Sequence, residues 1–253
     1  MLNDKQFYSL IKQADEPFSG WDFSFISGTG RMKNDLLSWS YGSIAISLIQ
    51  NSKSMLDMGT GGGEFLSKLL PFPASVYATE SYKPNVSIAK ERLTPLGVKV
   101  VEIDDDSNLP FETGQFDLII NQHESFSAKE VRRIISKEGL YLTQQVGGLD
   151  CKEINENLRI PINEEYKDWN LNVASNEIQE NDFEVLKSIE EFPIQRFYDI
   201  GALLYYLKAI PWQVPGFEIE KFKDELYSIH KMIEEKGYFD VKQHRFMILA
   251  KAI

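Results

Sequence analysis

One stretch, residues 55–66, constrains the fold of this 253-residue chain more than any other. A short apolar run ends in Asp57 and enters a turn with four glycines in the five positions 59–63. Glycines let a backbone turn sharply and approach a ligand without intervening side chains. Apolar side chains then recur at helical spacing, at Phe65, Leu66, Leu69 and Leu70. They predict a helix over about residues 62–70, and thus the strand–loop–helix order typical of a nucleotide-binding site.

Strand and helix patterns continue to alternate as far as residue 147. The predicted strands are residues 54–58, 75–79, 98–103, 116–121 and 140–146. Pro84 suits the first turn of a helix, and Ser127 with Glu130 forms a capping-box pattern. Such alternation predicts the α/β class, with a Rossmann-like doubly wound sheet that is mostly parallel. Ligands of such sheets bind at the carboxyl ends of the strands.

The composition argues against several classes of function. A formal charge of −11 repels phosphate backbones, so a nucleic-acid partner is not expected. The single cysteine, Cys151, can form neither an intrachain disulfide nor a multi-cysteine zinc site. The chain shows no signal-peptide pattern and no apolar run that could cross a bilayer. We therefore expect a cytoplasmic protein without membrane insertion.

Four elements in sequence order resemble the class I S-adenosyl-L-methionine (SAM)-dependent methyltransferases. They are the glycine-rich turn at 57–63, Glu80, residues 105–111 and residues 116–118. The likeness covers about residues 50–150. It is to the type 11 branch, which includes quinone-biosynthesis C-methyltransferases. The resemblance implies an enzyme that binds SAM and transfers its methyl group to a small-molecule acceptor.

The resemblance also assigns cofactor-binding roles to particular residues. Gly59 and Gly61 would bring the loop backbone to the amino-acid end of SAM. Asp57 would fix this loop or meet the SAM ammonium through water. Glu80 lies 21 positions after Gly59, where a carboxylate can accept both ribose hydroxyls. Asp105, four positions before Leu109, matches the residue that binds the adenine amino group.

The remaining cofactor-binding residues flank these positions. Asp106 stands where the family has a small residue, so its contact with adenine is expected through the backbone. Thr60, Ser81 and Asn121 complete the predicted set, and Asn121 lies at the end of a predicted strand.

The family places the substrate chemistry after the fourth strand, where His123 and Glu124 lie. A histidine can remove a proton from a hydroxyl or amine near neutral pH, and Glu124 could orient it or bind a polar substrate group. Alternatively, His123 makes a local hydrogen bond and only shapes the pocket. Methyl transfer gains mainly from alignment, so it does not require a strong base. The other two histidines, His230 and His244, are predicted to be structural.

The whole chain, residues 1–253, is predicted to form one methyltransferase domain. Residues 1–45 form an N-terminal cap of helices and aromatic side chains, and residues 46–150 the SAM-binding core. Residues 151–237 form a helical insertion, and residues 238–253 close the sheet as an antiparallel last strand. The insertion carries aromatic side chains that we expect to line an apolar substrate pocket: Phe197, Tyr198, Tyr205, Tyr206, Trp212 and Phe217.

Three residues of the cap and its border are candidates for contact with SAM. Trp39 or Tyr41 could lie near the sulfonium as a cation–π partner. Arg31, set among glycines and aromatic residues, could meet the SAM carboxylate. Packing of the aromatic side chains against the sheet explains this segment equally well.

Dinucleotide and metal sites fit the sequence less well. NAD folds also place an acid about 20 residues after a glycine-rich turn. However, Glu64 at the predicted helix start is poorly matched to a pyrophosphate, and residues 109–111 have no role in that fold. Residues 104–106 form an acidic run, but neighbouring side chains on an extended segment point in alternating directions. No histidine cluster accompanies them, so no metal is expected.

Two other functions stay open. Residues 127–139 faintly resemble part of the ribosomal-RNA guanine methyltransferases, although those proteins carry an N-terminal cysteine zinc cluster that this chain lacks. A non-catalytic SAM-binding protein is the other alternative, because cofactor motifs do not show that transfer occurs. The acceptor atom and the oligomeric state are not determined by the sequence.

Overall fold

The computed structural model describes residues 4–18 and 22–253. Its contacts divide the chain into two compact units. The seven-stranded unit comprises residues 38–146, 170–190 and 246–253. The three-stranded unit comprises the described residues up to 37, residues 147–169 and residues 191–245. Among the described residues, no helix has both the length and the apolar character that a membrane crossing requires.

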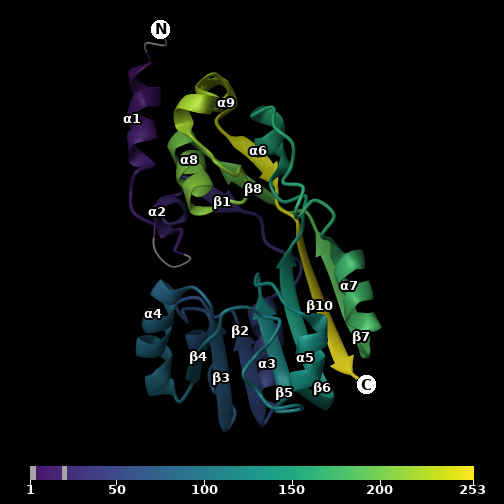
Figure 1. Cartoon of the computed structure of the whole chain (residues 1–253). Coiled ribbons are helices and arrows are strands. Elements are labelled where there is room, and N and C mark those ends of the chain that lie inside the picture. The colour runs from purple at the N-terminus through teal and green to yellow at the C-terminus, as the bar shows by residue number, and fades with distance from the viewer. Residues whose placement is uncertain (1–3, 19–21) are drawn as a thin grey trace. The chain divides into compact units, whose positions relative to one another are not determined.

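The seven-stranded unit is built on one mixed sheet. Its strands lie in the order β4-β3-β2-β5-β6-β10-β7 (Figure 1). Their bounds are β2 (Ser54–Met58), β3 (Ser75–Glu80), β4 (Lys99–Glu102), β5 (Phe116–Gln122), β6 (Ile135–Val146), β7 (Phe183–Glu191) and β10 (Arg245–Ala252). The neighbours from β4 through β6 pair in parallel. This arrangement confirms the predicted Rossmann-like α/β fold.

Strand β10 runs antiparallel to β6. At one end, the Gly147 N–H donates to the His244 carbonyl over 2.9 Å. At the other, Lys251 Nζ lies 3.3 Å from a carboxylate oxygen of Glu138. The late residues of β10 thus lie beside the early residues of β6, which confirms the predicted antiparallel last strand. It is not an edge strand, because β7 lies outside it.

Helices cover the sheet, so its central strands are apolar on both faces. Leu56 and Ile119 on adjacent strands are fully buried. The helical segments of this unit are α3 (Tyr41–Ile49), η1 (Leu66–Lys68), α4 (Lys83–Leu93), η2 (Thr94–Leu96), α5 (Ala128–Ile134) and α7 (Leu171–Glu180). Ser127 caps α5 by accepting a hydrogen bond of 3.3 Å from the Glu130 N–H. The carboxylate of Glu130 instead accepts from the Leu109 N–H at 2.7 Å, so only one side of the capping box forms.

The prediction of a helix over about residues 62–70 is wrong. A single turn of 3₁₀-helix, η1, is present there. Gly61 and Gly63 have φ angles of 62° and 78°, in the left-handed region that an α-helix cannot contain. Pro71 stops any continuation at the other end.

The three-stranded unit combines a small antiparallel sheet with most of the remaining helices. Its strands are β1 (Met32–Asn34), β8 (Ile194–Phe197) and β9 (Phe239–Lys242), with β8 in the centre. Its helical segments are α1 (Lys5–Gln13), α2 (Ser24–Ser27), α6 (Lys152–Asn157), α8 (Ile200–Ala209), η3 (Ile219–Phe222) and α9 (Lys223–Lys236). The predicted closing strand, residues 238–253, is therefore divided between β9 in this sheet and β10 in the other.

Helix α8 forms the centre of the core of the three-stranded unit. It is apolar on nearly every side, as expected of a buried helix. Phe197, Tyr205 and Tyr206 pack in the same core and are at most 6% exposed. These side chains hold the unit together instead of lining an open pocket. Trp212, in contrast, is exposed.

Candidate active site

The glycine-rich loop leaves β2 at its carboxyl end and is anchored to β3. The Gly59 N–H donates to the Thr79 hydroxyl at 3.3 Å, and the Thr60 N–H donates to the Thr79 carbonyl at 2.9 Å. Gly59 has a φ of 65°. A Cβ added there would overlap the side chain of Glu124. Both the conformation and the space therefore require glycine.

Glu80 ends β3 and lies against this loop. Its side chain accepts a hydrogen bond from the Tyr82 N–H at 2.7 Å. Burial raises the pKa of Glu80, while hydrogen bonds from the N–H groups of Tyr82, Gly61 and Ser81 act against the rise. The predicted residues Gly61, Glu80 and Ser81 are thus brought together at one strand end.

Asp57 lies near the end of β2, where it pairs with Ala78, two residues before Glu80. It is 6% exposed, and burial raises its pKa to about 7, with a further contribution from the charge of Glu80. Two carboxyl groups thus stand at neighbouring strand ends and influence each other. Their proximity confirms that the carboxyl ends of these strands converge, as the sequence predicts.

The two predicted adenine-binding acids after β4 have different surroundings. Asp105 is exposed and accepts hydrogen bonds from the N–H and hydroxyl of Ser107, which lower its pKa. Asp106 accepts a hydrogen bond of 2.5 Å from the hydroxyl of Ser125, in the loop after β5. Burial raises the pKa of Asp106. Asp106 therefore links two of the loops that surround the site.

Glu124 completes a group of four carboxyl groups with Asp57, Glu80 and Asp106. Burial, followed by the charges of Asp106 and Glu80, raises its pKa to about 7. A cavity of about 450 Å³ adjoins Glu124 and Asp106. Its lining residues are Ser81, Asp104, Asp105, Asp106, Ser107, Glu124, Ser125, Phe126 and Ser127, with no lysine or arginine among them. This pocket is suited to a ligand that carries positive charge.

The glycine-rich loop, the carboxylate that ends β3 and the strand order occur together in one segment of the chain. A sequence profile described as a methyltransferase domain matches residues 56–142. These residues match the methyltransferase-domain family. A search of curated protein sequences finds no match.

Solved structures with the same fold include several methyltransferases. A putative methyltransferase from Bacillus halodurans shares 17% identity at a TM-score of 0.58, over 83% of this chain and 98% of that one. A second structure is geranyl diphosphate C-methyltransferase from Streptomyces coelicolor, in complex with Mg²⁺, geranyl diphosphate and S-adenosyl-L-homocysteine. It shares 15% identity at a TM-score of 0.51, over 84% of this chain and 78% of that one. The [4+2]-cyclase SpnF shares 13% identity at a TM-score of 0.55, over 98% of this chain and 94% of that one. At these identities the likeness establishes the fold.

Asn121 does not line the cavity beside Glu124, but it contacts Ser125, which does. It is fully buried, and its side-chain oxygen accepts from Gln145 at 2.9 Å and from Thr143 at 3.3 Å. Its side-chain nitrogen donates to the Ser125 carbonyl at 3.3 Å. Its side chain thus joins β5 to β6 and supports the following loop.

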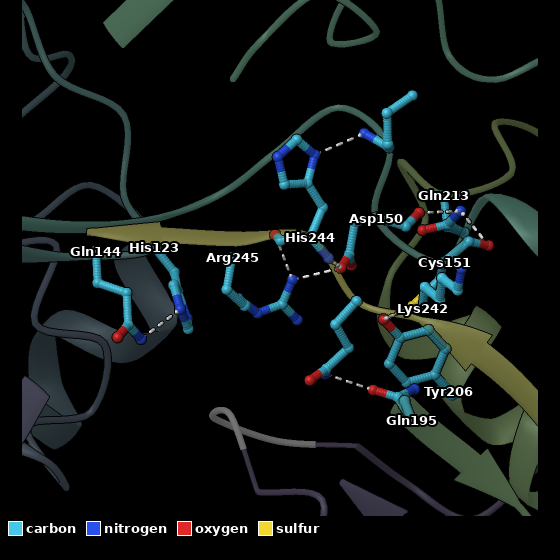
Figure 2. Close-up of polar contacts among 12 residues, drawn as sticks. His123, Gln144, Asp150, Cys151, Gln195, Tyr206, Gln213, Lys242, His244 and Arg245 are labelled. Atoms are coloured by element: carbon cyan, nitrogen blue, oxygen red, sulfur yellow. Dashed lines mark hydrogen bonds and ion pairs between the residues drawn. The ribbon is translucent and has the colours of Figure 1, made fainter. Parts of the chain in front are cut away.

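His123 is exposed and adopts a φ of 64° in the loop after β5. Its N–H donates to the Gln144 carbonyl at 2.7 Å, and its ring lies 3.0 Å from the Gln144 side chain (Figure 2). The local hydrogen bond considered in the sequence analysis is therefore present. Sequence reasoning missed Gln144 and Gln145. The available signal was two consecutive amides near the carboxyl end of a predicted strand.

In the three-stranded unit, Arg31 binds Asp199 through two hydrogen bonds of 2.7 and 2.6 Å. The guanidinium that the sequence suggested as a partner of the SAM carboxylate is therefore paired with Asp199. His244 accepts from the Leu149 N–H at 3.2 Å and stacks on Phe192 with ring centres 4.5 Å apart. These contacts are in keeping with a structural role for His244.

A second group with metal-ligand chemistry lies where α1 meets α9. Single ligand atoms of Asp4, His230 and Glu234 lie within 4.8 Å of one another. The ammonium of Lys231 already lies 3.0 Å from Asp4 Oδ2 and 2.5 Å from Glu234 Oε2. This lysine thus forms ion pairs with both carboxylates.

Proposed function

We propose that the protein is a SAM-dependent methyltransferase acting on a small-molecule acceptor. The observation that carries the proposal is the meeting of Glu80 with the glycine-rich loop at the ends of β2 and β3. A carboxylate there can accept hydrogen bonds from the two ribose hydroxyls, since it has about four lone-pair positions. The methyltransferase domain that contains both elements supports SAM as the cofactor.

The chemistry of the pocket fits this cofactor. Asp57, Glu80, Asp106 and Glu124 surround the carboxyl ends of the strands, and burial raises the pKa of each. SAM carries a sulfonium and an ammonium group and no phosphate, so these acids would stabilise it. A dinucleotide would bring two phosphate charges into the same field, where repulsion would oppose binding.

Five of the predicted residues then have roles that their positions allow. The backbone at Gly59 and Gly61 would receive the amino-acid end, and Glu80 the ribose. Asp105, which is exposed beside the cavity, would meet the adenine amino group, and Asp106 would hold the adenine loop through Ser125. Bound SAM supplies an electrophilic methyl group, and the protein supplies alignment.

Glu124 and His123 stand on the loop where the acceptor is expected. Glu124, with a pKa of about 7, can bind a proton or a cationic group near neutral pH. His123 offers a ring N–H or lone pair, depending on its tautomer. A small-molecule acceptor accords with the net charge of −11, which disfavours RNA.

The fold alone does not fix the reaction, because the solved structures that share it include a [4+2]-cyclase. Binding without methyl transfer is therefore the second candidate. Incubation of the protein with methyl-labelled SAM and a cell extract, followed by mass spectrometry, distinguishes the two. Labelled products that require the protein support transfer. SAM binding without any labelled product supports the second candidate.

Calorimetry with SAM tests the cofactor assignment directly. Glu80→Ala should weaken SAM binding tenfold or more, about 1.4 kcal/mol. Glu102→Ala is the matched control, because Glu102 pairs with Glu80 in register on β4 but is exposed. Equal affinities for the two variants would contradict the proposed ribose site.

A further inference from the structure

Three side chains of the seven-stranded unit form a continuous hydrogen-bonded chain. The indole Nε1 of Trp39 lies 2.8 Å from Gln144 Oε1, and Gln144 Nε2 lies 3.0 Å from His123 Nε2 (Figure 2 shows the second contact). Trp39 is 8% exposed and Gln144 is 4% exposed. The amide therefore joins a buried indole to the exposed imidazole of His123, in the loop after β5.

The chemistry of these groups fixes the direction of each hydrogen bond. An indole nitrogen can only donate, so the Gln144 atom that faces Trp39 must be the carbonyl oxygen. The amide NH₂ of Gln144 then faces His123 and can only donate. His123 Nε2 must accept, which requires a lone pair on that nitrogen. In a neutral imidazole with a lone pair on Nε2, the proton is on Nδ1.

We propose that Gln144 is a positioning residue that holds His123 in the tautomer protonated on Nδ1. The basic Nε2 of His123 is then engaged by Gln144, and the ring carries its proton on Nδ1. This role differs from the general base considered in the sequence analysis. The tautomer follows from the three contacts themselves, whereas its use in methyl transfer rests on the proposed function.

The backbone strengthens the same arrangement. The His123 N–H donates to the Gln144 carbonyl at 2.7 Å, so both the main chain and the ring of His123 are fixed to the same residue of β6. Such a second partner sets the orientation and tautomer of a functional histidine. An Nδ1–H donor suits an acceptor that offers an oxygen or nitrogen lone pair, and it would orient that atom without removing its proton. Glu124, on the same loop, is then the group available to take a proton.

The test is nitrogen-15 NMR of the histidine rings at a pH where they are neutral, without any cofactor. The chain has three histidines, and His123→Ala identifies the signals of His123. The parent protein should show a protonated Nδ1 and an unprotonated Nε2 for this ring. A ring protonated on Nε2 would overturn the proposal. The rings of His230 and His244 serve as internal references.

Two variants test the role of Gln144. In Gln144→Glu the carboxylate can only accept, so the proton of the neutral ring should move to Nε2. In Trp39→Phe the indole N–H that orients the amide is lost, and the ring should become a mixture of tautomers. Trp212→Phe is the matched control, since Trp212 is exposed. Should Gln144→Glu fold and keep the parent's ring signals, Gln144 does not set the tautomer.

The functional consequence has its own readout. A Gln144→Glu variant that binds SAM like the parent, but whose rate depends differently on pH, supports a positioning role in transfer. If the pH–rate profiles of Gln144→Glu and His123→Ala both match that of the parent, the tautomer of His123 has a structural role and none in methyl transfer. Loss of SAM binding by the parent would instead contradict the proposed function and would leave the NMR result intact.

Discussion

The carboxyl group of Glu124 lies directly over Gly59 of the glycine-rich loop. A Cβ added to Gly59 would stand 2.5 Å from Glu124 Oε2 and still closer to Glu124 Cγ. The loop after β5 and the loop after β2 are thus in contact beside the proposed SAM site. We therefore expect substitution of either residue to alter SAM binding.

Gly59→Ala should weaken SAM binding at least tenfold, because the new methyl group displaces Glu124 and the φ of 65° strains an alanine. Gly97→Ala is the control: Gly97 has a φ of 83°, but an added Cβ meets nothing within 4 Å. Both variants carry the left-handed cost of roughly 1–2 kcal/mol. Calorimetry with SAM and urea unfolding separate the two effects. Equal losses of affinity would show that contact with Glu124 is unimportant.

Glu124→Gln should reduce the preference for SAM over its neutral product, S-adenosyl-L-homocysteine. SAM carries one more positive charge, and Glu124 ionises with a pKa of about 7. In the parent, the ratio of the two dissociation constants should therefore move in favour of SAM by about threefold to tenfold between about pH 6 and pH 8. The ratio in the variant should change less with pH. Parallel curves for parent and variant would show that Glu124 does not sense the sulfonium.

Asp57→Asn should stabilise the ligand-free protein at alkaline pH. The folded-state pKa of Asp57 is about 7 and its ordinary value is 3.8, so the folded protein retains a proton that the unfolded chain releases. Stability is therefore lost as the pH rises from about 4 to about 7, by up to roughly 4 kcal/mol. The variant should lack this loss and should exceed the parent in urea unfolding at about pH 8, but not at about pH 4. A parent stability that is independent of pH would contradict the buried, protonated Asp57.

Arg31→Lys should destabilise the three-stranded unit by about 1–3 kcal/mol. Arg31 and Asp199 are both less than 20% exposed, and Asp199 also caps α8 through the Ala202 N–H at 2.9 Å. A lysine cannot reproduce the paired hydrogen bonds. Lys208→Ala, which removes the more exposed ion pair with Asp15, should cost less than about 1 kcal/mol. Thermal unfolding compares the two variants. Equal decreases in their unfolding temperatures would show that the Arg31–Asp199 pair contributes no more to stability than the exposed pair.

Much of the seven-stranded unit could be predicted from local sequence. The strand at residues 54–58 was predicted with the bounds that β2 has, and Ser127 caps α5 as expected. Strand periodicity and capping depend on neighbouring residues, so the sequence contains them directly. The acids at strand ends could also be placed together, because parallel strands align their carboxyl ends. The helix after the glycine-rich loop was the local error, since the φ angles of Gly61 and Gly63 outweighed the apolar spacing.

By itself, the sequence determined the glycine-rich loop, the position of Glu80 after β3 and the family to which they point. Only the tertiary structure decided that β7 and β8, separated by Pro193 and Phe192, belong to different sheets. It alone decided that Tyr205 and Tyr206 are core and that Gln144 holds His123. The physical reason is that burial and hydrogen-bond partners are set by residues distant in the chain, such as Trp39 for Gln144, and no local pattern specifies such partners.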